Sequence, residues 1–213
     1  MSAEFVARME DVLDLYAEPF DPERPVVCFD ETSKQTVKHT RVPLPVAPSR
    51  PARYDYEYER NGTSNLFMFF EALRGWRHVE VTERRTAQDF AYQMKWLVDE
   101  ACPDATVVRV VLDNLNTHTI ASLYKTFKPA EARRIARRLE FHHTPNHGSW
   151  LNMAELEFSV FVRECLKQRI PDRQTLSREV AALERERNAA EAKASWRFTS
   201  QDARVKLAKL YPS

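Results

Sequence analysis

The sequence predicts an α/β fold, in which a mixed sheet with an antiparallel three-strand meander has helices on both faces. Two largely apolar runs are typical of strands buried inside such a sheet, VVCFD at 26–30 and TVVRVVLD at 106–113. Between them, alternating or apolar segments separated by turn residues indicate consecutive antiparallel strands. Segments with helical periodicity before, between and after the strands would form the covering layers.

The amino-terminal part of the chain is expected to form one helix and one short strand. Apolar residues recur at helical spacing over 3–16, and prolines end that region. The strand at 26–30 follows. Residues 31–53 contain several prolines with basic residues between them, so we expect an irregular excursion with at most a short strand near 36–40.

The predicted meander consists of three strands, at 54–60, 65–73 and 76–83. Asn61-Gly62 is a strong signal for a hairpin between the first two of them. A helix is expected to begin around Thr86, because apolar residues then recur at helical spacing until Pro103.

The second half is expected to contain a strand at 140–144 and five helices, over 119–127, 129–139, 150–168, 173–193 and 200–210. Ser149 is a plausible cap for the third of these helices. The strands at 26–30 and 106–113 are expected to be neighbours in the sheet. Their ends would then bring Asp30 and Asp113 together.

We divide the chain into an amino-terminal helix and linker at 1–24, an α/β core at 25–171, and a carboxy-terminal helical extension at 172–213. A chain of 213 residues with 43% hydrophobic residues can bury a sizeable core. Its net charge of +1 neither favours nor opposes nucleic acid as a partner, because the distribution of charge matters more than the sum.

Composition argues against several kinds of site. With only 3 glycines, the chain has neither a GxxxxGK[ST] nor a GxGxxG loop. Its 3 cysteines are scattered and form no CxxC pair, so neither a structural zinc site nor a disulfide framework is indicated. No apolar run approaches the roughly 18 residues that span a bilayer. We therefore expect a cytoplasmic location without a membrane partner.

Three acidic residues form the pattern that points most directly to chemistry. Asp30 and Asp113 end two predicted strands, and Glu155 lies early in a predicted helix. Carboxylates on separate elements can converge and hold hard divalent cations such as Mg²⁺. Two such ions can activate a nucleophile, stabilise a leaving oxygen and neutralise phosphate charge, as phosphodiester cleavage requires. The alternative for each Asp is a turn or helix-capping role.

The same weighing applies to neighbouring polar residues. Glu31 is expected to point to the opposite sheet face from Asp30, and Glu157 to be a solvated charge. Asn152 shares a helix face with Glu155, where it would orient the carboxylate, meet DNA or simply contact solvent. HExxH is absent and no nucleophile elbow is present, so a catalytic zinc and a Ser-His-Asp triad are both disfavoured.

Three motifs follow one another along the chain: VVCFDETSKQ, VVLDNLNTHT and HHTPNHGSWLNMAELEFSVF. Together they resemble the DDE-type transposases of bacterial insertion sequences, in the insertion-sequence 630 branch of the mariner superfamily. The third motif is the most specific, through its Pro-x-x-x-Ser-Trp-Leu-Asn-x-x-Glu pattern. The separation of Asp113 and Glu155, 155 − 113 = 42 positions, fits this branch. The similarity extends from about residue 3 to the end of the chain.

The resemblance implies a ribonuclease H-like fold and an endonuclease that uses Mg²⁺ or Mn²⁺, with two ions, to cleave transposon ends and join them to target DNA. It implies that Asp30, Asp113 and Glu155 are the catalytic, metal-binding residues. Other motif residues become candidates for supporting the carboxylates or contacting DNA, with loop and packing roles as the alternative: Asn114, Asn116, His118, Trp150 and Asn152.

Transposon ends and target DNA are the implied partners, and such enzymes usually act as homodimers or larger assemblies because two ends are handled together. Lys34, Arg50 and Arg53 are candidates for phosphate contacts. Relatives carry an amino-terminal helix-turn-helix region, for which the 29 residues before Asp30 are too few. We therefore expect such a segment to be encoded separately, or this chain to be a truncated product.

Two further functions stay open as alternatives. One is a truncated, non-catalytic regulator of transposition that binds DNA or intact subunits. The other is a ribonuclease H-like nuclease with a cellular role. The resemblance places the protein in a bacterial cytoplasm, associated with the nucleoid when it is bound to DNA.

Overall fold

The computed structural model describes residues 3–40 and 57–212. Its centre is a five-stranded sheet with the order β3-β2-β1-β4-β5. The strands are β1 (Val26–His39), β2 (Tyr58–Glu71), β3 (Trp76–Thr82), β4 (Val108–Leu112) and β5 (Leu139–His143). Strands β1, β2 and β3 form an antiparallel meander, whereas β4 pairs in parallel with both β1 and β5. The predicted mixed sheet is therefore confirmed.

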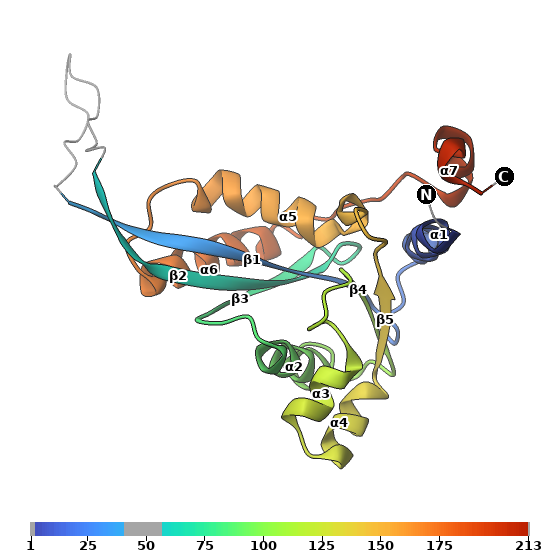
Figure 1. The fold of residues 1–213 in the computed structure, drawn as a ribbon, viewed down its shortest axis with the longest axis horizontal. Helices are drawn as coiled ribbons and strands as arrows, with labels where there is room; N and C mark the ends of the chain where they lie inside the picture. Colours follow the sequence, from blue (N-terminus) through green and yellow to red (C-terminus); the bar gives the residue numbers. More distant parts are fainter. Residues whose placement is uncertain (1–2, 41–56, 213) are drawn as a thin grey trace.

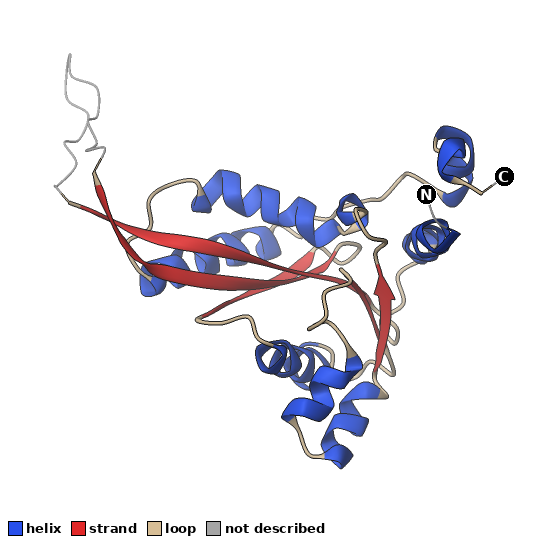
Figure 2. Cartoon of the chain, in the orientation of Figure 1, coloured by secondary structure: helices blue, strands red, loops and turns tan. Residues whose placement is uncertain are grey.

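Helices cover both faces of this sheet (Figures 1 and 2). The helices are α1 (Ala3–Ala17), α2 (Ala87–Trp96), α3 (Ile120–Thr126), α4 (Pro129–Ala136), α5 (Met153–Phe161), α6 (Arg173–Ala189) and α7 (Ser200–Lys206). In Figure 1, α5 and α6 lie above the sheet and α2, α3 and α4 lie below it. Helices α1 and α7 lie beside each other near β5. None of the helices in the described ranges combines the length and apolar character needed to cross a bilayer.

Alternation along the strands divides the core into two layers. Cys28 and Met68 are buried with α1, α5 and α6 on one face of the sheet. Phe29 and Phe69 are buried with α2, α3 and α4 on the other face. Successive side chains of a strand point to opposite faces, so the continuous apolar run in β1 supplies both layers.

The prediction of which segments form the three strands of the meander was partly wrong. We expected a hairpin at Asn61-Gly62, but these residues lie inside β2. They lie opposite Thr36 of β1, where the register shifts between Gln35 and Val37, so the extra residue of this irregularity is in β2. Gly62 has φ of 90°. Positive φ is needed in a tight hairpin and also at some β-bulges, so the dipeptide alone does not distinguish them.

The irregular excursion predicted for 31–53 was also wrong in its first part. Strand β1 continues through this region to His39 and pairs with β2 along that length. This outer part of the hairpin extends beyond β4, as Figure 1 shows. This part of β1 lies outside the layered core and is polar, and we had grouped it with the proline-rich segment that follows it. The prolines of the excursion lie at 41–56, outside the described residues.

The predicted helices are present with shorter bounds. Thr86 caps α2 through a capping box with Asp89, as expected. Helix α2 continues into a π-helical turn, η1 (Leu97–Ala101), shortly before Pro103. Ser149 does not cap α5: it begins a 3₁₀ turn, η2 (Ser149–Leu151), and the cap lies three residues later.

Glu157, which we expected to be a solvated charge, is buried in an ion-pair network. Arg77 of β3 is 0% exposed, and its Nε lies 3.0 Å from Oε1 of Glu157 on α5 without hydrogen-bond alignment. Arg187 of α6 donates to both oxygens of Glu157, at 2.6 and 2.9 Å. The Arg77 guanidinium also donates to the backbone oxygens of Gly75 and Ala192. One buried carboxylate thus links α5 to β3 and α6.

Helix α6 also protects the free edge of β3. The Asn188 amide accepts from the backbone N–H of Arg77 and donates to its carbonyl, both at 2.8 Å. Oε2 of Glu184 accepts from the backbone N–H of Val79 at 2.9 Å. These side chains occupy hydrogen-bonding groups that an edge strand would otherwise offer to another chain.

The buried network gives a stability prediction. Glu157→Gln leaves two arginines without their carboxylate, so the free energy of unfolding should fall by about 3 kcal/mol in urea titrations. Glu164→Gln makes the same chemical change at an exposed position shortly after α5, and it should cost less than about 0.5 kcal/mol. Equal unfolding midpoints for the two variants would contradict the network's role.

Candidate active site

Asp30 and Asp113 lie where β1 and β4 stop pairing. The parallel register ends with Cys28 opposite Val111. Asp30 is two residues beyond Cys28 and Asp113 is two residues beyond Val111, so parallel strands bring both to the same level. Strand β1 continues from Asp30 with β2 alone, whereas the chain leaves β4 for the loop before α3.

Glu155 is brought to this point by Asn152, the N-cap of α5. The Asn152 side-chain oxygen accepts from the backbone N–H of Ala154 at 3.1 Å. Its Nδ2 donates to the carbonyl of Phe29 at 2.8 Å. One buried amide therefore caps the helix and ties it to the residue before Asp30. Glu155 follows in the first turn, where the helix dipole favours a negative charge.

These elements enclose a pocket of about 270 Å³. It is lined by Asp30, Glu31, Thr32, Asp113, Ser149, Asn152, Glu155 and Phe158. The structure thus brings the three predicted carboxylates to one concave site.

The electrostatics of Asp30 show how close these groups lie. The pKa of Asp30 is raised to about 7, mainly by burial and also by the negative charges of Asp113 and Glu155, against the opposing effect of the hydrogen bond from the backbone N–H of Glu31. Its carboxyl group is therefore partly protonated near neutral pH. A positive charge between the carboxylates would remove this repulsion.

His118 joins the two strand ends from the other face of the sheet. The imidazole is 0% exposed and hydrogen-bonds to Asp113 through Nδ1, while its Nε2 lies 3.4 Å from Oε2 of Glu31. Burial would lower the pKa of His118, but the hydrogen bonds to Asp113 and Glu31 raise it to about 9. Arg85 lies 3.3 Å from the other Glu31 oxygen. Glu31 does point away from Asp30, as expected, yet it belongs to the site's supporting contacts.

The donor set fits a hard divalent cation, because its three members are carboxylates. Among the side chains that the structure describes, no three acidic, histidine or cysteine groups are arranged closely enough to hold a metal ion by themselves. The pocket lining and the charge coupling show that the carboxylates are neighbours. Substrate oxygens and water would have to complete the coordination of a cation held here.

The sequence from 25 to 177, 153 of 213 residues, matches the family model described as DDE superfamily endonuclease. The chain belongs to this family. This DDE endonuclease domain finds no match among curated proteins.

Solved structures show the same fold. The mariner Mos1 paired end complex with Mg is 16% identical with a TM-score of 0.59, covering 98% of this chain and 63% of that chain. The Mos1 strand transfer complex is 15% identical with a TM-score of 0.55, covering 89% and 61%. This DDE endonuclease domain has the ribonuclease H-like fold of the Mos1 transposase, and it spans less than two thirds of those chains.

The remaining motif residues of the DDE endonuclease domain have different surroundings. Asn114 and Asn116 are exposed in the loop that follows Asp113. Trp150 is 40% exposed and stacks with Trp196 at 6.1 Å between ring centroids. The asparagines are free to face a ligand, whereas part of the Trp150 ring covers the carboxy-terminal segment. Their contacts with DNA stay predictions.

The predicted basic contacts lie away from the carboxylates or outside the described residues. The Lys34 ammonium donates to the carbonyl of Leu166 and to that of Gln168 at 3.3 Å, so part of its hydrogen-bonding capacity is used. Arg50 and Arg53 fall within 41–56, which the structure does not describe. Their role at phosphates stays a prediction.

Sequence reasoning missed two features of the site. The cap role of Asn152 was detectable, because Asn-x-x-Glu at 152–155 has the spacing of a capping box. The pairing of Glu31 with His118 and Arg85 was not detectable, since residues 54 and 87 positions away supply the partners.

The raised pKa of Asp30 predicts a stability cost at the site. The folded-state pKa of about 7 exceeds the usual value of 3.8 for an aspartate, so stability is lost as pH rises between these values. In the absence of divalent cations, the free energy of unfolding of Asp30→Asn should therefore exceed that of wild type by about 1–3 kcal/mol at pH 8. The two proteins should differ little at pH 4. Asp104→Asn is the exposed control. If urea titrations gave the same difference in free energy of unfolding between Asp30→Asn and wild type at both pH values, the prediction would be contradicted.

Proposed function

We propose that this chain is the catalytic domain of a DNA transposase, which cleaves transposon ends and joins them to target DNA. Its family supports nuclease chemistry on DNA. The observation that carries the proposal is the meeting of Asp30, Asp113 and Glu155 in one pocket, where the charges of Asp113 and Glu155 destabilise that of Asp30. Such repulsion is expected where a site is built for cations and phosphate.

Asp30, Asp113 and Glu155 would hold two Mg²⁺ or Mn²⁺ ions. When bound, these ions would neutralise phosphate charge and activate an oxygen nucleophile. The chain's own contribution is position. His118 fixes Asp113 through its buried imidazole, and Asn152 sets Glu155 against the strand that carries Asp30. The carboxylates would thereby be held near their working geometry before substrate arrives.

The assembly and partners of the enzyme are part of the proposal. The related Mos1 structures are described as a paired end complex and a strand transfer complex. By analogy, two copies of this chain would act together on two DNA ends, in association with the bacterial nucleoid. The chain spans 61–63% of those chains. Recognition of the ends by a helix-turn-helix segment is part of the proposal.

A joining assay tests the proposed activity. A duplex with a free 3′-hydroxyl transposon end is incubated with supercoiled target plasmid and Mn²⁺. Wild type should nick the plasmid and join the duplex to it, and Asp113→Asn should lose both products by at least about a hundredfold. Asp104→Asn changes an exposed aspartate that does not line the carboxylate pocket, so this variant should behave like wild type.

The outcome also separates the alternatives. Nicking without joining, lost in Asp113→Asn, would indicate the ribonuclease H-like nuclease. Binding of the duplex without either product would indicate the non-catalytic regulator. Equal product from wild type and Asp113→Asn would assign the activity to a contaminant.

The spacing of the carboxylates makes a separate prediction for metal binding. Because no three such groups among the described side chains are arranged closely enough to hold a metal ion by themselves, Mn²⁺ should bind weakly to the free protein, with Kd on the order of 1 mM. Phosphate oxygens of a DNA end should tighten binding by about tenfold or more, and Glu155→Gln should reduce that gain. Mn²⁺ titration followed by electron paramagnetic resonance measures both. Micromolar binding without DNA would contradict this arrangement.

A further inference from the structure

Tyr16 of α1 connects the two elements that carry Asp30 and Glu155. Its side chain is buried in the same core layer as Cys28 and α5. Its hydroxyl donates to the carbonyl of Leu151 at 2.8 Å and lies 3.2 Å from Sγ of Cys28. A phenol has one proton to donate, so the Cys28 thiol is the donor in the second contact. The Tyr16 oxygen therefore bridges β1 and the turn η2.

Both partners of this hydroxyl are close in the chain to a carboxylate of the pocket. Cys28 precedes Asp30 by two residues in β1, so the two side chains point to the same face of the sheet. Leu151 immediately precedes Asn152, the N-cap of α5, and Glu155 follows in the first turn of that helix. A movement of η2 away from β1 would therefore carry the start of α5, with Glu155, away from Asp30.

The Cys28 thiol also lies against the first turn of α5. Burial raises the pKa of Cys28 to about 11, and the nearby backbone N–H groups of Met153 and Ala154 act in the opposite direction. These N–H groups belong to the first two residues of α5. The pair formed by Tyr16 and Cys28 thus contacts both η2 and the helix that follows it.

The carboxy-terminal segment holds the Tyr16 ring from the other side. Trp196 packs on this ring with 5.5 Å between centroids, and it also stacks on Trp150 of η2 at 6.1 Å. Arg204 of α7 donates to both carboxylate oxygens of Glu10 on α1, at 2.8 and 2.9 Å. These contacts fix α1, and with it the Tyr16 hydroxyl, before any ligand binds. Both helices lie outside residues 25–177, the range that matches the family model.

We propose that Tyr16 is a positioning residue of the active site, whose hydroxyl sets the start of α5 against β1 and thereby holds Glu155 beside Asp30. This role rests on the proposed function, because the hydroxyl acts only through the carboxylates that would hold the metal ions. Without the hydroxyl, the Leu151 carbonyl and the Cys28 thiol lose this partner, and η2 is free to move. Functional sites work only within about 0.5 Å of their productive geometry, so a small movement of α5 has a large effect on metal binding.

Amide hydrogen exchange of the full chain without metal or DNA tests the structural half of the proposal. Tyr16→Phe keeps the ring and removes only the hydroxyl. The amides of Asn152 and Glu155 donate within η2 and the start of α5. Their exchange rates should rise about tenfold more than the rate of Val110 in β4, which reports on unfolding of the sheet. Equal acceleration at all three amides, or none, would overturn the proposal.

Mn²⁺ titration tests the functional half by electron paramagnetic resonance. With a DNA end present, the Mn²⁺ concentration that half-saturates the site should rise about fivefold or more in Tyr16→Phe. A partly unfolded sample would lower the amplitude of the titration without moving this midpoint. Adding Tyr16→Phe to Glu155→Gln should cause no further rise, because the hydroxyl acts through Glu155.

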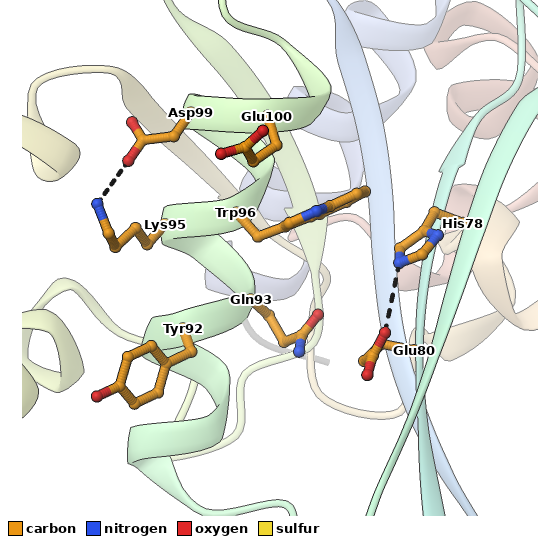
Figure 3. Close-up of a pocket in the computed structure, with 8 residues that line it drawn as sticks. All are labelled: His78, Glu80, Tyr92, Gln93, Lys95, Trp96, Asp99 and Glu100. Atoms are coloured by element: carbon orange, nitrogen blue, oxygen red, sulfur yellow. Dashed lines mark hydrogen bonds and ion pairs between the residues drawn. The ribbon is translucent and has the colours of Figure 1, made fainter. Parts of the chain in front are cut away.

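Two other tyrosine-to-phenylalanine changes are matched controls. Tyr211→Phe removes a hydroxyl that donates to Glu10 at 2.8 Å, so it takes one hydrogen bond from the same helix, α1. Tyr92→Phe acts on the other face of the sheet, at a cavity of about 440 Å³ between α2 and β3, where Lys95 is paired with Asp99 (Figure 3). Both variants should keep the wild-type Mn²⁺ midpoint.

The results separate the role of Tyr16 from the proposed function. A wild-type Mn²⁺ midpoint in folded Tyr16→Phe would overturn the positioning role, as would an equal shift of the midpoint in Tyr211→Phe. If wild type itself binds no Mn²⁺, the proposed metal site fails. The exchange rates of Asn152 and Glu155 then decide on their own whether Tyr16 holds the start of α5.

Discussion

The point at which β1 and β4 stop pairing determines the rest of the site. The two strands share a register up to Cys28 and Val111, and each then carries an Asp two residues further on. Because the strands are parallel, this places the two carboxylates side by side. Their negative charges repel each other. The fold must supply the energy that holds them there. Strand β2 does so by pairing with β1 through and beyond Asp30, opposite Met68.

The third carboxylate depends on contacts behind the site. Asn152 fixes the start of α5 to β1, whereas Glu157 fixes the same helix to Arg77 and Arg187 on the far side. Glu155 lies between these two anchors in sequence. A helix held at both its cap and its buried face cannot rotate or slide to relieve repulsion between the carboxylates. We infer that the buried ions, which are costly in themselves, stabilise the functional orientation of α5.

The sequence was informative where a pattern was local and repeated. The apolar runs of β1 and β4, the capping box at Thr86 and the break at Pro129 all produced the expected elements. It failed where a local signal had two structural meanings. Asn61-Gly62 fits a hairpin and a bulge equally, and only the pairing of β1 with β2 decides between them. The outer part of β1 was predicted as part of an irregular excursion, because its polar residues pair with β2 outside the core and lack an apolar pattern.

The carboxylates could be proposed from their motifs, but their environment could not. Glu31 and Glu157 looked alike in the sequence, as charges beside a candidate catalytic residue. In the structure each is about 5% exposed and each is paired with cations from distant elements. What separates a solvated charge from a buried support is the partner, and those partners lie 30 or more positions away.

The carboxylate pocket and the cavity between α2 and β3 differ in how their polar groups are compensated. In the carboxylate pocket, like charges are close and the pKa of Asp30 rises to about 7, so the protein itself leaves negative charge uncompensated. Between α2 and β3, the charges of Lys95 and His78 are paired with carboxylates. The first arrangement attracts cations strongly and selects little among them.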